Sequence, residues 1–100
     1  MRVIAVSRLR AFWMKHPHAE QALRAWVKAA GAANWAKPSD ITSEFTTATV
    51  LKSRRVVFNI KGNDYRLVVA VAYRFGAVYV KFVGTHRQYD RIDADSVETL

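Results

Sequence analysis

Residues 54–90 read RRVVFNIKGNDYRLVVAVAYRFGAVYVKFVGTHRQYD, and this stretch decides the fold. Its apolar residues follow the alternation of β-strands, and the pattern is interrupted at Lys61-Gly62-Asn63 and at Gly76-Ala77. Glycine in such short breaks is typical of tight hairpin turns. The stretch therefore predicts three antiparallel strands in a meander, over residues 54–60, 64–75 and 78–85.

The two turns also predict the register. With Gly62-Asn63 as a loop, Asn59 pairs with Arg66 and Arg55 with Ala70, and with Gly76-Ala77 as the next loop, Arg74 pairs with Tyr79. Alternation then places one apolar set on the face that we expect helices to cover: Val56, Phe58, Ile60, Tyr65, Leu67, Val69, Val71, Tyr73, Val78, Val80 and Phe82. The other face is expected to be open and carries polar side chains with small or β-branched residues between them: Arg55, Asn59, Lys61, Arg66, Arg74, Tyr79, Lys81 and Thr85, with Val57, Val68, Ala70, Ala72 and Val83.

The residues before this stretch are expected to supply the helices. Residues 1–6 are β-prone and predict an edge strand, after which Ser7 can cap a helix that ends before Pro17. A second helix from Pro17 is indicated by apolar residues at the i, i+3, i+4, i+7 spacing: Ala19, Ala22, Leu23, Trp26, Val27 and Ala30. We expect Gly31 or Asn34 to end it.

The segment after the second helix has weaker signals. Pro38 followed by Ser39 or Asp40 predicts one short helical turn through Phe45. The Thr-rich residues 42–50 fit either a loop or a short strand. Taken together, the chain is expected to form a single α+β domain over residues 1–100.

The composition limits the class of protein. The chain of 100 residues carries 16 Lys and Arg against 8 Asp and Glu, a formal net charge of +8, and no cysteine. Disulfide scaffolds, thiolate metal sites and cysteine nucleophiles are therefore excluded. No apolar run has the length of a signal peptide or membrane helix, so we expect a cytoplasmic protein without membrane contact.

The cations gather on the predicted sheet, where residues 52–87 contain eight of them and one acid, Asp64. A positive field of this kind favours nucleic acid, because phosphate groups are its natural counterpart. A basic surface kept for solubility and an acidic protein partner are the alternatives. The last residues, 88–100, are acidic and either fold over the basic face or only keep the chain soluble.

A polar segment ends the predicted sheet. Thr85 and Gln88 match a capping box, which predicts a short helix from His86 and places His86, Tyr89 and Asp90 on one side of it. Histidine transfers protons near neutral pH, aspartate orients it, and tyrosine donates or orients, so the three suit phosphodiester chemistry beside a cationic face. A purely structural role for these groups is the alternative.

Metal binding is not expected. His16 and His18 are two residues apart around a helix break, where their side chains do not converge, and no third ligand is near in the sequence. We therefore predict neither a metal site nor a cofactor.

Residues 56–90 resemble HigB-type toxins of bacterial toxin–antitoxin pairs. The pieces that match are Phe58-Asn59, Gly62-Asn63, Tyr65-Arg66-Leu67, Thr85-His86 and Tyr89-Asp90, and residues 37–41 (KPSDI) resemble the family's Lys-Pro loop. The resemblance implies a RelE-like fold, with two N-terminal helices on a small, mainly antiparallel sheet and a short C-terminal helix. It also implies an mRNA endoribonuclease, often ribosome-associated, that inhibits translation and is neutralised by a helix-turn-helix antitoxin of the HigA type.

The resemblance implies metal-independent cleavage that leaves a 2′,3′-cyclic phosphate and a 5′-hydroxyl. Arg66 would then bind the scissile phosphate, His86 act as acid or base, Tyr89 assist it or stack on a base, and Asp90 orient His86. RNA contacts would come from the polar residues around them: Arg55, Asn59, Lys61, Arg74, Lys81 and Arg87. A ParE-like toxin that acts on gyrase and a non-catalytic RNA- or protein-binding module are the alternatives.

Overall fold

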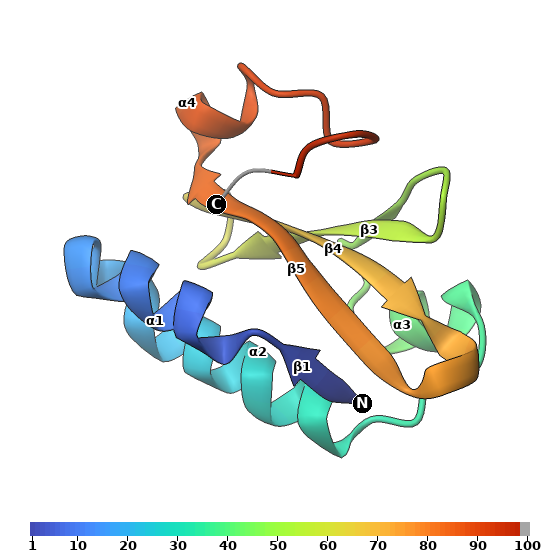
Figure 1. Ribbon diagram of the computed structural model, residues 1–100. Coiled ribbons are helices and arrows are strands. Elements are labelled where there is room, and N and C mark those ends of the chain that lie inside the picture. Colours follow the sequence, from blue (N-terminus) through green and yellow to red (C-terminus); the bar gives the residue numbers. More distant parts are fainter. Residues whose placement is uncertain (99–100) are drawn as a thin grey trace.

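The computed structural model describes residues 1–98 and has helices on one face of a five-stranded sheet (Figure 1). Residues 99 and 100, which the expected domain includes, lie outside the described part. The strands are β1 (Arg2–Ile4), β2 (Thr49–Val50), β3 (Arg55–Ile60), β4 (Tyr65–Ala72) and β5 (Ala77–Thr85), in the spatial order β1-β5-β4-β3-β2. Among the strands of residues 1–98, only the β1–β5 pair is parallel. The expected α+β, RelE-like architecture is confirmed, and the edge strand expected within residues 1–6 is present as β1. β2 is a short strand at the other edge.

The helical elements are α1 (Val6–Lys15), the 3₁₀ turn η1 (Pro17–Ala19), α2 (Glu20–Ala32), α3 (Pro38–Glu44), the 3₁₀ turn η2 (Tyr73–Phe75) and α4 (His86–Tyr89). The predicted break at Pro17 is confirmed. The cap at Ser7 is wrong, because α1 already begins at Val6 and its N-cap, Ala5, makes no side-chain hydrogen bond. Gly31 does not end α2, which continues to Ala32. No helix within residues 1–98 has the length and apolar character needed to cross a membrane.

α1 and α2 pack on the sheet through a continuous apolar core. Leu9, Leu23, Phe58 and Leu67 are almost completely buried, and the Trp26 ring meets the Phe58 ring edge-on with centroids 5.3 Å apart. Burial of such a side chain stabilises the fold by about 1.5–3 kcal/mol relative to exposure. This core holds the sheet rigid beneath the polar end of β4 and β5.

The register of the first hairpin is as predicted, whereas that of the second is not. Asn59 pairs with Arg66 and Arg55 with Ala70. In the second hairpin Tyr79 pairs with Ala70, not with Arg74. The reason is that residues 73–75 leave the strand as η2, and Gly76 follows with φ +63°, so the loop is longer than the predicted Gly-Ala turn.

A β-bulge in β5 changes which side chains face the helices. Val69 pairs with Val80 and Val68 with Phe82, so Lys81 is an extra residue between them. One extra residue reverses the alternation beyond it. The predicted placement is therefore wrong beyond the bulge: Phe82 lies on the outer face, and Val83 lies in the core with the helices. Thr85, predicted on the outer face, pairs with Tyr65 and so lies on the helix side.

The outer face of the sheet is not open as predicted, because the end of the chain covers it. After α4 the chain runs back across the face opposite α1 and α2 (Figure 1). We call residues 91–98 the C-terminal strap. Its Val97 is buried in a second, smaller apolar cluster with Val57, Val68 and Phe82. Of the two roles considered for the acidic end, folding over the basic face is the one observed.

Charged groups hold the strap in place. Arg55 is 6% exposed, and its guanidinium donates to the carbonyl oxygens of Ala94 (3.2 Å) and Val97 (2.6 Å). Glu98 accepts from Arg55 at 2.6 Å and from Lys81 at 2.9 Å. The two cations of β3 and β5 therefore bind the chain's own C-terminal segment.

Candidate functional site

The capping box predicted at the start of α4 is confirmed. The Gln88 N–H donates to Thr85 Oγ1 at 3.2 Å, and the Thr85 N–H donates to Gln88 Oε1 at 2.8 Å. This turn brings His86 Nδ1 within 3.0 Å of Asp90 Oδ2, and both side chains are exposed. A carboxylate on one ring nitrogen orients the imidazole and leaves the other nitrogen free to exchange a proton.

The direction of α4 follows from the bulge as well as from the cap. The backbone N–H of His86 donates to the Asp64 carbonyl at 3.1 Å, which extends the β4–β5 ladder by one residue. Because Lys81 reverses the alternation, Val83 points inward and the chain leaves the sheet with His86 directed away from the core. Regular alternation would have turned His86 toward the helices.

Arg66 lies beside this helix on the neighbouring strand. It pairs with Gly84, and its guanidinium carbon is 5.8 Å from the centre of the Tyr89 ring. One terminal nitrogen donates to the carbonyls of Asn63 (3.0 Å) and Tyr65 (3.2 Å), which fixes the side chain. Within residues 1–98 the other guanidinium nitrogens have no hydrogen-bond partner, so they remain available for an anion.

Sequence reasoning missed Gly84 as part of this arrangement. A Cβ atom at this position would lie 2.5 Å from the Phe82 ring and 2.8 Å from Gln88 Oε1. Glycine is therefore required for the Phe82 ring and the capping Gln88 side chain to pack against the strand beneath Arg66. A glycine next to Thr85 in a strand was the available signal, since glycine inside a strand often marks close approach of another group.

The predicted site residues separate into two groups. One group lies together at the end of the sheet where β4 begins and β5 ends: Asn59, Lys61, Arg66, His86, Arg87, Tyr89 and Asp90. Of these, Lys61 is exposed in the hairpin turn with φ +53°, and Asn59 is the half-buried β3 partner of Arg66.

The remaining three predicted residues are elsewhere. Arg55 and Lys81 lie under the C-terminal strap, where both contact Glu98. Arg74 is exposed in η2, beyond the opposite end of β4. At ~3.3 Å per residue, the length of β4 from Arg66 to Ala72 alone separates Arg74 from Arg66 by roughly 20 Å.

The C-terminal strap carries an acidic side chain, Glu98, whereas the predicted site is rich in cations. The hydrogen bond from Lys81, with smaller contributions from the charges of Lys81 and Arg55, holds the pKa of Glu98 below its ordinary value despite some desolvation. Glu98 therefore stays ionised and neutralises cations on the middle of the sheet. Among residues 1–98, no three His, Cys, Asp or Glu side chains gather as a metal site would require.

Comparison with known proteins identifies the family of the chain. Residues 19–92 match the HigB toxin family, described as the RelE-like toxic component of a toxin–antitoxin system. The chain is 27% identical over 92 residues to the mRNA interferase toxin HigB of Escherichia coli K12, covering 90% of this chain and 88% of that protein. The mRNA interferase HigB proteins of Escherichia coli O157:H7 and Shigella flexneri match equally well. The chain belongs to the HigB family of RelE-like toxins.

Proposed function

We propose that this toxin is an mRNA endoribonuclease that stops translation and growth. The observation that carries the proposal is the exposed His86–Asp90 pair, 3.0 Å apart, on the helix whose Tyr89 contacts Arg66. This combines a proton-transfer group with a cation that has free donors, which cleavage of a phosphodiester requires. The relatives named mRNA interferases support RNA as the substrate.

In the proposed reaction the 2′-hydroxyl of the RNA attacks the adjacent phosphorus. The bond from O2′ to phosphorus forms as the bond to O5′ breaks, which leaves a 2′,3′-cyclic phosphate and a 5′-hydroxyl. The 2′-hydroxyl loses a proton to a base, and O5′ gains one from an acid. His86, oriented by Asp90, carries out one of these transfers, and Tyr89 either assists it or stacks on a base. Arg66 donates to the phosphate oxygens as negative charge develops.

The surrounding residues would hold the RNA. Asn59, Lys61 and Arg87 adjoin the cluster and would contact the nucleotides next to the cleaved bond. Arg55 and Lys81 would reach RNA only if the C-terminal strap moved away, and Arg74 would contact only a distant part of a long RNA or of the ribosome. We propose mRNA on the ribosome as the substrate, the cytoplasm as the location, and a helix-turn-helix antitoxin of the HigA type as the partner that neutralises the toxin.

Induced expression in growing bacteria tests the function. We expect new 5′ ends on cellular mRNA, detected by primer extension, and growth arrest that Arg66→Ala and His86→Ala each relieve while the protein stays folded. The matched controls are Arg10→Ala and His18→Ala, which change exposed residues of the same types on the helical side. Full arrest by both site variants at equal expression would refute the site. Growth arrest with gyrase-dependent DNA damage and no new 5′ ends would instead indicate a ParE-like toxin.

A further inference from the structure

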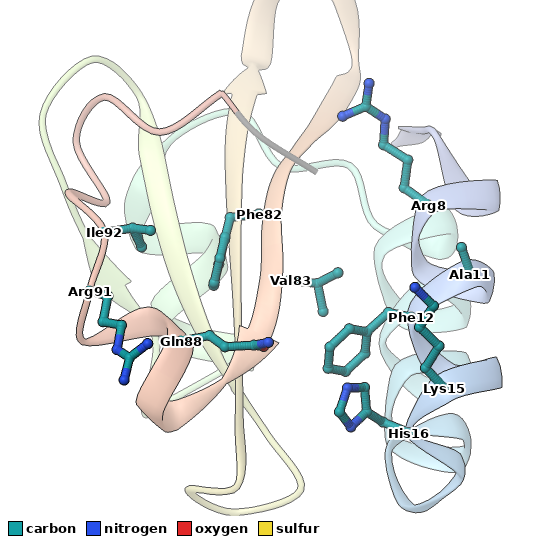
Figure 2. Close-up of a pocket in the computed structure, with 10 residues that line it drawn as sticks. All are labelled: Arg8, Ala11, Phe12, Lys15, His16, Phe82, Val83, Gln88, Arg91 and Ile92. Atoms are coloured by element: carbon teal, nitrogen blue, oxygen red, sulfur yellow. The ribbon is translucent and has the colours of Figure 1, made fainter.

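A groove separates α1 from the end of β5 and the turn of α4 (Figure 2). Its volume is about 590 Å³, and its floor is formed by Phe12, Phe82, Val83 and Ile92. The Phe12 ring stacks on the His16 ring with centroids 4.3 Å apart, so the α1 side presents a flat apolar surface. A segment of another molecule that fills the groove would bury apolar side chains here.

The rim of the groove is positively charged. Arg8 and Lys15 are exposed one above the other on α1, and Arg91 lies on the opposite side, after α4 (Figure 2). No Asp or Glu is among the residues that line it. Its occupant is therefore expected to be apolar along its length and acidic at its edges.

The floor of the groove also contains an unpaired strand edge at Val83, a residue whose side chain is buried in the core. β1 covers β5 only as far as the Ile4–Tyr79 pair. The His86 N–H donates to the Asp64 carbonyl. Because hydrogen-bonded pairs alternate along an antiparallel ladder, the residues of β5 and α4 that bond toward β4 are His86, Gly84 and Phe82. The N–H and C=O of Val83 therefore point away from β4, toward α1. Neither group has a hydrogen-bond partner among residues 1–98. Such an edge accepts an extended polypeptide, because the backbone of a polypeptide offers a complementary N–H and C=O.

The groove lies on the far side of α4 from the His86–Asp90 pair. The groove is lined on the α4 side by Gln88, Arg91 and Ile92. His86 and Asp90 are four residues apart and therefore share one side of the helical turn, which is the side opposite Gln88. A molecule in the groove would touch α4 without covering His86. The groove is thus a separate surface from the proposed RNA site.

We infer that this groove binds an extended segment of the cognate antitoxin, with apolar side chains facing Phe12 and Val83, acidic side chains facing Arg8 and Lys15, and backbone hydrogen bonds to Val83. The charge of the rim, the apolar floor and the open strand edge all fit such a segment. The inference rests on membership of a toxin–antitoxin family and not on RNA cleavage. The two can therefore fail independently.

Titration of the purified toxin with the antitoxin encoded beside it tests the inference. We expect the double variant Arg8→Glu/Lys15→Glu to weaken binding by at least about tenfold, since like charges would then face each other. Ala11→Trp, which fills the groove from an exposed position on α1, is expected to have a similar effect. Arg10→Glu/Lys28→Glu and Ala25→Trp are the matched controls, because they make the same changes at exposed helical positions outside the groove.

RNA cleavage by the same variants separates the possible occupants. We expect the groove variants to keep their growth arrest and their cleavage of mRNA, and to escape neutralisation by the co-expressed antitoxin. Antitoxin affinity equal to that of the unmodified toxin would refute the inference. Loss of RNA binding, measured with a single-stranded oligoribonucleotide, in variants that still bind antitoxin would also refute it and would assign the groove to RNA.

Hydrogen exchange gives a second test that needs no substitution. In the complex of the unmodified toxin with its antitoxin, the Val83 amide is expected to exchange at least about tenfold more slowly than in the free toxin, because it would donate to the added segment. An unchanged exchange rate at Val83 would refute the strand pairing even if the groove variants proved unstable.

Discussion

Arg55 and Arg66 illustrate how differently two arginines on one sheet face can be used. Both were predicted on the outer face, and both are there, in the same hairpin. Arg66 lies at the open end beside Tyr89, whereas Arg55 is buried and bound to backbone carbonyls of the C-terminal strap. Alternation predicts on which face a side chain lies, but not what covers that face, because the covering segment is distant in the sequence.

Replacement of Arg55 tests its structural role. We expect Arg55→Met to lower the free energy of unfolding by about 2 kcal/mol, because the Ala94 and Val97 carbonyls lose their donor in a buried place. Urea denaturation measures the change, and Lys52→Met, at an exposed position nearby, is the control. A variant of unchanged stability that no longer cleaves RNA would mean that Arg55 contacts the substrate instead.

At the scale of elements, α4 and β5 were both predicted, but the register of β5 and its bulge were not. The capping box depends on Thr85 and Gln88 alone, so local sequence predicted it correctly. The hairpin around Gly62-Asn63 was predictable for the same reason. The η2 turn and the bulge at Lys81 were not, because they depend on how β5 fits between β4, β1 and the helices.

The cap gives a prediction about activity. Thr85→Ala removes the hydroxyl that accepts from the Gln88 N–H, so α4 should fray and the His86–Asp90 pair should lose its alignment. We expect RNA cleavage to fall by about fivefold for a cap contribution of ~1 kcal/mol, with little loss of overall stability. Initial rates on an oligoribonucleotide and thermal unfolding measure the two effects. Thr85→Ser keeps the hydroxyl and should retain most of the activity. Equal rates for the two variants would argue against a role of the cap in the site.

At the scale of the whole molecule, the C-terminal strap makes the fold three-layered: helices, sheet and strap (Figure 1). It neutralises the cations in the middle of the sheet and leaves those near His86 free. On the sheet itself, the strap thus covers Arg55 and Lys81, whereas Arg66 lies at the end that the strap leaves uncovered. Composition alone showed the acidic end but could not place it on the sheet.

The strap also predicts a pH dependence. The pKa of Glu98 is lowered in the folded protein. Its ion pairs therefore stabilise the fold at pH values above the ordinary carboxyl pKa, and this stabilisation is lost as the pH falls through the lowered pKa. Because Glu98 is largely exposed, the effect is expected to be small. Denaturation curves for the unmodified protein and Glu98→Gln should differ at neutral pH and converge in acid. A difference that persists in acid would show that the Glu98 charge is not its cause.

Because of the bulge at Lys81, the direction in which the His86–Asp90 pair faces depends on the number of residues between Tyr79 and Thr85. Five residues separate Tyr79 from Thr85, and with five the chain leaves β5 on the side away from the helices. If only four residues separated Tyr79 from Thr85, the Thr85 cap would start the helix on the opposite side of the sheet. The His86–Asp90 pair would then face α1. The length of the segment should therefore be under stronger constraint than the identity of Lys81.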